Sequence, residues 1–165
     1  MEQLSLGQAG LRTFFIEHLN HLCSAKTQVL QRFPEIAAEA HFRDLKHAIR
    51  ETMENVEKQV ARMETIFMLL QYDSPARGSE AMKAVFESAF AAIHHQEPDP
   101  AKRDMSILFY MQLIEGIEMN SFQLLQMTAV KLKNIAVTQA LKESYDEAKE
   151  DRSLLLLIAA KYITK

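Results

Sequence analysis

The sequence predicts an all-α protein that forms one domain, spanning residues 1–165. Apolar residues recur at alternating spacings of three and four along most of the chain, which is the pattern of helices with one buried face. Only four glycines and four prolines interrupt the 165 residues, so long helices can form. No stretch alternates apolar and polar residues in the manner of a half-buried strand. An apolar content of 48% and a charged content of 25% indicate a globular chain.

Two long helices are predicted in the first half of the chain, at about residues 8–40 and 44–71. In the first helix, Lys26 interrupts an otherwise apolar face, and Pro34 removes one backbone donor without ending the apolar pattern. Asp44 is the predicted N-cap of the second helix, whose outer face is rich in charged residues. The apolar face of the first helix contains Leu11, Phe15, His18, Leu22, Ala25 and Val29, and that of the second contains Leu45, Ile49, Thr52, Val56, Met63, Phe67 and Leu70.

A short helix at about 79–95 is predicted within the connection between the two halves of the chain. Ser74 and Pro75 favour a loop before this helix, and Ser79 is its predicted start. His94 and His95 are expected to serve its C-terminus, where positive groups meet free backbone carbonyls.

The second half of the chain contains two more long helices, predicted at about 103–132 and 134–163. Asp104 is the predicted start of the first of them, and residues 131–134 are the predicted break between the two. Two long helical hairpins with one long crossover connection are the layout of a ferritin-like four-helix bundle. The predicted fold is therefore a ferritin-like bundle with a short extra helix in the crossover.

The third long helix carries two carboxylates in its apolar face. Leu108, Met111, Phe122 and Leu125 follow the spacing of a buried stripe, and Glu115 and Glu118 occupy its two missing positions. Burying an ionised carboxylate is costly unless a cation, a metal or a proton compensates its charge. The group that compensates Glu115 and Glu118 is therefore the main functional question that the sequence poses.

The composition of the chain also indicates which partners the protein is not expected to bind and in which cellular compartment we expect it. The formal charge of −3, with no basic cluster, argues against nucleic acid as a partner. The longest apolar run, residues 154–160, is too short to span a bilayer, so no membrane association is expected. Cys23 is the only cysteine and cannot form an internal disulfide. With no signal-peptide pattern at the N-terminus, we expect a cytoplasmic protein.

Short stretches throughout the chain resemble a known family, the small bacterial ferritin-like proteins of the YciE/YciF type. The resemblance runs from about Phe14 to Ile158, and it depends on the order and spacing of its pieces rather than on any single motif. It implies a ferritin-like bundle, a homodimer, a link to stress responses and a carboxylate-rich site suited to two iron or manganese ions. The matching residues are Ser24, Ala25 and Gln28; residues 59–64; Ala81 and Met82; Arg103 and Asp104; Glu115, Ile117, Glu118, Ser121 and Phe122; and Lys142, Glu143, Glu147 and Lys149.

The sequence departs from the family pattern where the resemblance places this metal site. Lys26 stands where the family has a glutamate in the first helix. Asn55 stands at the main glutamate position of the second helix, beside Glu54, and Ala148 replaces a glutamate of the last helix. Only Glu115 and Glu118 keep the carboxylates of the pattern. A di-metal site needs about four to six ligands from all four helices, so the matching residues fall short of that number.

These departures lead to a hypothesis in which Lys26 replaces the metal as the counter-charge of Glu115 and Glu118. The protein would then be a non-enzymatic member of the family, without a cofactor, that acts through oligomer formation or an unknown protein partner. One alternative is an iron or manganese site formed by Glu54, Glu115, Glu118 and Glu147, with weak oxidase or iron-handling activity. Another is small-molecule binding in the bundle centre. Lys26 could also extend to solvent instead, as long side chains often do.

His18, His21 and Cys23 are weaker candidates for chemistry. His18 and His21 are three residues apart on one helix and could share a metal, but structural roles are expected for both. No histidine and acid accompany Cys23 in the pattern of a catalytic site, so we expect a buried, inert thiol.

Overall fold

The computed structural model describes residues 6–73, 78–95 and 98–164 of the chain, and in these ranges it contains five helices and no strand. The predicted all-α fold is therefore confirmed. The predicted loop residues Ser74 and Pro75 lie outside the described residues. The helices are α1 (Gln8–Glu39), α2 (Arg43–Leu69), α3 (Glu80–His94), α4 (Pro100–Lys131) and α5 (Ile135–Ile163).

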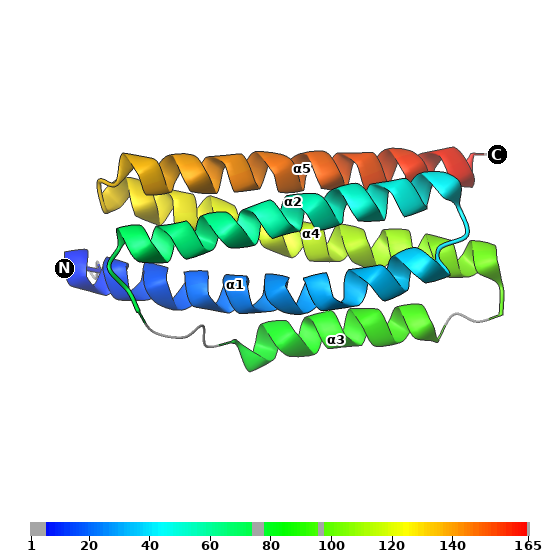
Figure 1. Ribbon diagram of the computed structural model, residues 1–165, viewed down its shortest axis with the longest axis horizontal. Helices are drawn as coiled ribbons and strands as arrows, with labels where there is room; N and C mark the ends of the chain where they lie inside the picture. Colours follow the sequence, from blue (N-terminus) through cyan, green and yellow to red (C-terminus); the bar gives the residue numbers. More distant parts are fainter. Residues whose placement is uncertain (1–5, 74–77, 96–97, 165) are drawn as a thin grey trace, which may run out of the picture.

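The four long helices lie side by side as two antiparallel hairpins, α1 with α2 and α4 with α5 (Figure 1). Helix α1 also packs against α4, and α2 packs against α5, which closes the bundle. The crossover from α2 to α4 contains α3, which lies outside the bundle against α1 and α4 (Figure 1). This is the predicted ferritin-like arrangement. Within the described ranges, no helix has both the length and the apolar character of a membrane-spanning segment.

Helix α1 continues through Pro34 for another turn and ends at Glu39. Pro34 lacks the N–H of a helical hydrogen bond, but Phe33 and Ile36 beside it are both buried in the core. The packing of these side chains keeps the segment helical, and the amide of Ala40 donates to the Ile36 carbonyl at 3.0 Å where the helix ends.

The start of α4 differs from the prediction. The helix begins at Pro100 rather than at residue 103, and its N-cap is Asp99, whose Oδ1 accepts from the amides of Ala101 at 3.0 Å and Lys102 at 3.1 Å. Proline favours the first helical position because its missing N–H would be unpaired there anyway. The other predicted bounds differ from the observed ones by at most two residues.

Asp104, the predicted start of α4, is instead fully buried and stabilises the start of α2. Its carboxylate accepts hydrogen bonds from the amide of His41, at 2.7 and 3.0 Å, and from the amide of Phe42. The predicted N-cap of α2, Asp44, was also wrong, because Phe42 holds that position and Asp44 pairs with Lys161 of α5. The carboxylate that caps α2 thus comes from α4.

The core consists of two apolar clusters, one toward each end of the bundle. One lies between the C-terminal part of α1 and the N-terminal parts of α2 and α4, and α3 adds Phe86 and Phe90 to it. The other lies between the N-terminal part of α1 and the N-terminal part of α5. A set of buried polar side chains separates the two clusters.

Candidate functional site

The buried polar side chains at the bundle centre form what we call the polar layer. Each of the four long helices contributes to it, because each carries a polar residue at a position where its apolar stripe continues on both sides. Side chains of this kind are rarely buried unless they are paired, so their partners decide what the layer can do. The layer consists of Lys26 from α1, Thr52 and Gln59 from α2, Glu115 and Glu118 from α4, and Ser144 and Asp151 from α5, with half-buried Asn55 at its edge.

Lys26 is fully buried, with 0% of its surface exposed, so its side chain does not extend to solvent. Its ammonium forms an ion pair with Oε2 of Glu118, which is also 0% exposed. The ammonium also lies 5.4 Å from the centroid of the Phe122 ring, a distance typical of a cation–π contact. Lys26, which stands where the family pattern has a glutamate, therefore supplies a positive charge to the carboxylates of α4.

Glu115 is also buried but has a different electrostatic environment. Burial raises the pKa of its carboxyl well above the ordinary value of 4.5, and the neighbouring charge of Glu118 raises it further. Lys26 acts in the opposite direction, and the balance favours the protonated form of Glu115. The two glutamates therefore have separate compensation, a proton for Glu115 and an ammonium for Glu118.

Asp151 of α5 is the third carboxyl of the polar layer, and the sequence did not predict it. Its Oδ1 accepts a hydrogen bond of 2.9 Å from the side-chain amide of Asn55. Burial raises its pKa from 3.8 to about 6, although the hydrogen bond from Asn55 and the charge of Lys26 lower it. A sequence signal did exist, because Ala148, Asp151 and Leu155 follow the same buried spacing of three and four. Asp151 lies within a run of charged residues, 149–152, that is typical of a solvated surface.

Glu54 and Glu147, the other two ligands of the alternative metal site, do not join the polar layer. Glu54 is exposed. Glu147 is directed to Arg62 of α2, with two hydrogen bonds of 2.6 Å. Ala148 is buried but offers no ligand atom. The structure therefore brings together Lys26, Glu115 and Glu118 with Asn55 nearby, but not the four glutamates of the alternative metal site.

These positions allow a test of whether the residues fit a di-metal centre. Such a centre draws carboxylate and histidine ligands from all four helices. Helix α1 contributes an ammonium, α2 a hydroxyl and two amides, and only α4 and α5 contribute carboxyls to the polar layer. Because the ammonium of Lys26 repels cations and already occupies Glu118, this donor set does not fit a pair of metal ions.

The contacts of His18, His21 and Cys23, the weaker candidates for chemistry, are those of structural residues. The His18 ring stacks on Phe14 with 4.0 Å between centroids, and its Nδ1 lies 2.9 Å from the Phe14 carbonyl oxygen. The His21 ring centroid lies 5.6 Å from that of His18. Cys23 is buried, and burial raises the pKa of its thiol, which makes it less reactive.

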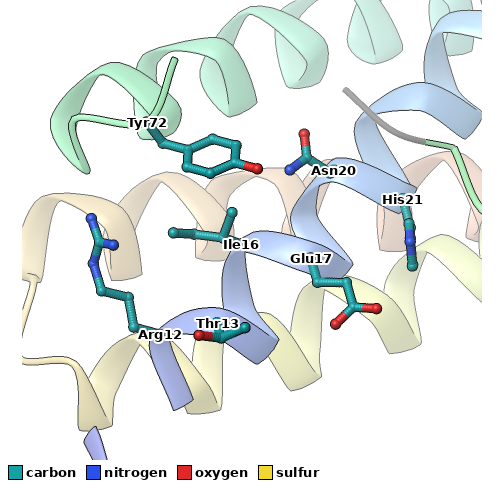
Figure 2. Close-up of a pocket in the computed structure, with 7 residues that line it drawn as sticks. All are labelled: Arg12, Thr13, Ile16, Glu17, Asn20, His21 and Tyr72. Carbon is teal, nitrogen blue, oxygen red and sulfur yellow. The ribbon is translucent and has the colours of Figure 1, made fainter. Parts of the chain in front are cut away.

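A pocket of about 430 Å³ opens along the N-terminal half of α1, away from the polar layer. Arg12 and His21 lie at its two ends, and the Tyr72 hydroxyl points across it toward Asn20 (Figure 2). Arg12 is already engaged, since its Nη2 donates to the Leu70 carbonyl at 2.5 Å. None of the residues that line this pocket belongs to the polar layer.

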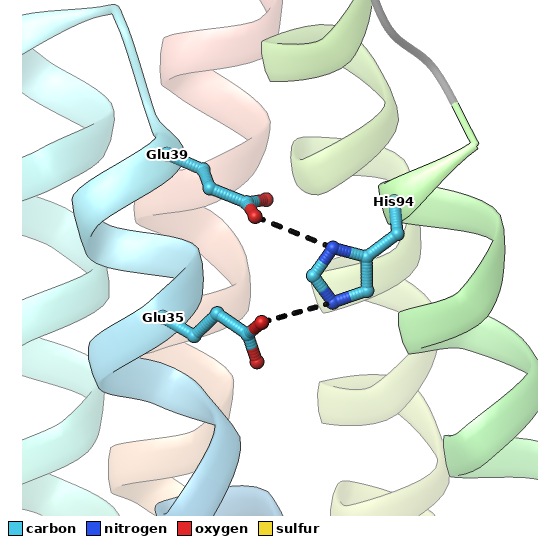
Figure 3. Close-up of side chains that lie close together, drawn as sticks. All are labelled: Glu35, Glu39 and His94. Atoms are coloured by element: carbon cyan, nitrogen blue, oxygen red, sulfur yellow. Dashed lines mark ion pairs between the residues drawn. The ribbon is translucent and has the colours of Figure 1, made fainter.

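His94 lies in the last turn of α3, and His95 is the C-cap of that helix, as predicted, but the ring of His94 also joins α3 to α1. Its ring lies between Glu35 and Glu39 of α1 (Figure 3), with Nε2 3.6 Å from Glu35 Oε1 and Nδ1 3.3 Å from Glu39 Oε1. Arg32 of α1 forms a second link to α3, with Nη2 3.1 Å from Glu87 Oε2. All of these side chains are partly exposed, and together they hold the crossover helix against the bundle.

Two antiparallel hairpins, a long crossover and a buried acidic layer define a ferritin-like four-helix bundle protein. The chain belongs to the family described as domain of unknown function DUF892, whose model matches residues 10–165. This membership confirms the predicted family resemblance.

Two solved structures share the fold. The E. coli stress protein YciF has a TM-score of 0.87 and 21% sequence identity, covering 94% of this chain and 98% of that one. YcfI from Rhodopseudomonas palustris has a TM-score of 0.83 and 19% identity, covering 94% and 97% of the two chains. The search of curated proteins gives no match.

Proposed function

We propose that the protein is a non-enzymatic, stress-associated ferritin-like bundle in which Lys26 takes the place of a metal charge. The observation that carries this proposal is the fully buried ion pair between the ammonium of Lys26 and Glu118. The stress association rests on the similarity to YciF, which is named a stress protein. The cytoplasm fits a chain whose single cysteine is buried and free.

The charges of the polar layer support a site that needs no metal. Lys26 balances Glu118, and the raised pKa of Glu115 favours the protonated form of that carboxyl. Asp151, with a pKa of about 6, is the remaining group that can carry a negative charge near neutral pH. One ammonium thus faces the carboxylate of Glu118, with which it is paired, and the carboxyl of Asp151, which titrates, so a divalent cation has little net charge to neutralise.

A competing function is metal binding, with weak oxidase or iron-handling activity. It is favoured by one oxygen on each of Glu115, Glu118 and Asp151 that is buried and has no hydrogen-bond partner in the described part of the chain. These oxygens could accept a cation only if Lys26 were removed or moved away. The identity of residue 26 therefore separates the two functions.

Metal content measured by mass spectrometry, before and after aerobic incubation with ferrous or manganous salts, tests the proposal. We expect the wild type to take up no stoichiometric metal, whereas Lys26→Glu, which restores a carboxylate, gains iron or manganese. Lys149→Glu, at an exposed position of α5, is the matched control. Roughly two ions per wild-type chain, the load of a di-metal bundle, would overturn the proposal in favour of the oxidase reading.

A further inference from the structure

Three side chains of the kinds that bind metal ions meet where the crossover helix packs against the bundle (Figure 3). Glu35 and Glu39 lie four residues apart on α1, so their carboxylates share one face of the helix. His94 comes from the last turn of α3, and its ring points between the two carboxylates. One ring nitrogen and one oxygen of each glutamate all lie within 4.8 Å of one another. We call these three residues the crossover cluster.

The distances within the crossover cluster fit ligands that surround one ion. Nε2 of His94 lies 3.6 Å from Oε1 of Glu35, and Nδ1 lies 3.3 Å from Oε1 of Glu39. Both distances exceed the range of about 2.7–3.2 Å in which an N–H group normally donates to an oxygen. Two ligands of a tetrahedral zinc ion, each about 2.0–2.1 Å from the metal, lie about 3.4 Å apart. The spacing therefore fits a shared cation better than direct hydrogen bonds.

One oxygen of the crossover cluster lacks the partner that its burial requires. Oε2 of Glu39 is buried and accepts no hydrogen bond within the part of the chain that the structure describes. Buried polar atoms are normally paired, and leaving one unpaired costs free energy. The backbone at Glu39 is held in place, since Nη2 of Arg103 donates to its carbonyl at 2.6 Å. A cation bound by Glu39 would satisfy this oxygen without moving the end of α1.

The donors of the crossover cluster also indicate the class of metal. Imidazole together with carboxylates suits zinc, whereas calcium and magnesium prefer sites made of oxygen alone. The nearest competing cation is Arg32, whose Nη1 lies 3.6 Å from Oε2 of Glu35 and whose Nη2 lies 3.1 Å from Oε2 of Glu87. A zinc ion would draw Glu35 away from Arg32, which would keep Glu87 as its partner.

We propose that Glu35, Glu39 and His94 bind one zinc ion, completed by water, and that this ion ties α3 to α1. Because the two ring nitrogens point in different directions, only one of them binds the ion. The glutamate beside the other nitrogen turns toward the metal, which is sterically open because both carboxylates are partly exposed.

The crossover cluster is separate from the polar layer, and the proposal does not depend on the function of that layer. Glu35 follows Lys26 by nine residues, which is about 14 Å along the helix. The same donors bind manganese and ferrous ions more weakly than zinc. The iron and manganese measurement can be repeated in His94→Ala, which removes the zinc site and leaves the polar layer intact.

Isothermal titration calorimetry with zinc chloride, on the full chain without a histidine tag, is the first test. We expect about one zinc ion per wild-type chain, and loss of binding in His94→Ala and in Glu39→Gln. His95→Ala, next to the crossover cluster but outside it, is the matched control and should bind as the wild type does. No zinc binding by the wild type would overturn the proposal. Undiminished binding by His94→Ala would also overturn it, and would point to His18 and His21 instead.

Arg32→Gln gives a second test, whose sign distinguishes a metal site from a set of ion pairs. The substitution removes a positive charge and frees Glu35 from its competing partner, so zinc should bind more tightly than to the wild type. Weaker or unchanged zinc binding would contradict the role of Glu35 as a ligand.

Thermal unfolding tests whether the ion joins the two helices. A ligand that binds only the folded chain raises its stability, so zinc in excess should raise the melting temperature of the wild type. It should leave that of His94→Ala unchanged, and circular dichroism would verify that this variant is folded. An equal rise in both proteins would place the ion elsewhere and contradict the proposal.

Discussion

The side-chain amide of Asn55 donates a 2.9 Å hydrogen bond to the carboxylate of Asp151 and so joins α2 to α5 at the level of Lys26. The family resemblance places a glutamate at position 55, and a second carboxylate there would repel Asp151. In the same way, the ammonium of Lys26 pairs with the carboxylate of Glu118, where a glutamate at position 26 would repel it. Two departures from the pattern thus supply N–H donors to the two carboxylates that they face, and the changes fit one another.

Lys26→Met should destabilise the protein by about 3 kcal/mol, or roughly 6–12 °C in melting temperature, because it leaves Glu118 buried without its partner. Thermal and urea unfolding would measure the loss. Lys149→Met, at an exposed position, should change stability by no more than about 0.5 kcal/mol. Equal effects at the two positions would mean that the buried ion pair contributes nothing.

Glu118→Gln and Glu115→Gln should differ strongly although the two residues are one helical turn apart. Glu118→Gln leaves the buried ammonium of Lys26 without a counter-charge and should cost about 3 kcal/mol. Glu115 is already favoured in its neutral form, so a neutral amide of the same shape should cost about 1 kcal/mol or less. Urea unfolding of the two variants measures the two losses of stability. A larger loss for Glu115→Gln than for Glu118→Gln would contradict the assignment of the proton to Glu115 and of the ammonium to Glu118.

Asp151 should make the stability of the protein decrease as pH rises. A carboxyl whose pKa is 3.8 in the unfolded chain and about 6 in the folded one binds protons more tightly when folded. Its stabilising contribution is present below pH 3.8 and is lost as pH rises through about 6. Once ionised, it opposes folding by about 3 kcal/mol.

Asp151→Asn, which keeps an oxygen that can accept from Asn55, tests this effect. The variant should be more stable than the wild type at about pH 7.5, and the difference should vanish near pH 4. Chemical unfolding across this range measures it. Glu150→Gln, at the exposed neighbouring position, serves as the control and should show no such trend. A wild type whose advantage over Asp151→Asn grows with pH would contradict the sign.

Asp104→Ala should loosen the start of α2, although the residue belongs to α4. The buried carboxylate of Asp104 accepts from the amides of His41 and Phe42 in part-buried hydrogen bonds, and leaving such donors unpaired costs about 1 kcal/mol. Hydrogen exchange should show faster exchange at these two amides. Asp99→Ala removes an exposed N-cap of α4 and should leave them protected. Unchanged exchange after Asp104→Ala would exclude the capping role.

Much of the fold could be predicted from the sequence because helix periodicity is a local property. The spacing of apolar residues predicted five helices, and Ser79 was correctly placed at the start of α3, where its Oγ accepts from the Met82 amide. The prediction that Asp104 starts α4 was wrong because a carboxylate near a helix start can accept from the amides of that helix or of another one. The sequence does not show which of the two helices it stabilises. The sequence also did not identify the partners of the His94 ring, because Glu35 and Glu39 lie more than fifty residues away in the chain.

The candidate site was predicted less completely. Glu115 and Glu118 stood out because their neighbours are apolar, and Lys26 because it interrupts an apolar face. Asp151 did not stand out, since Lys149, Glu150 and Arg152 surround it. Glu147 was a ligand only of the alternative metal site, and the sequence did not indicate its partner Arg62, which comes from another helix. Which side of a charged helix turns inward depends on the neighbouring helix, and a single sequence does not contain that information.

The two apolar clusters and the charged groups between them also determine how the four helices align along the bundle axis. If one helix slid by a single turn, about 5.4 Å, Lys26 and Glu118 would separate, and the displaced charge would face apolar side chains of one of the two clusters. Apolar contacts alone would tolerate such a shift far better. The buried charges therefore favour a single alignment of the four helices along the bundle axis. They would keep this role even if they never bound an ion.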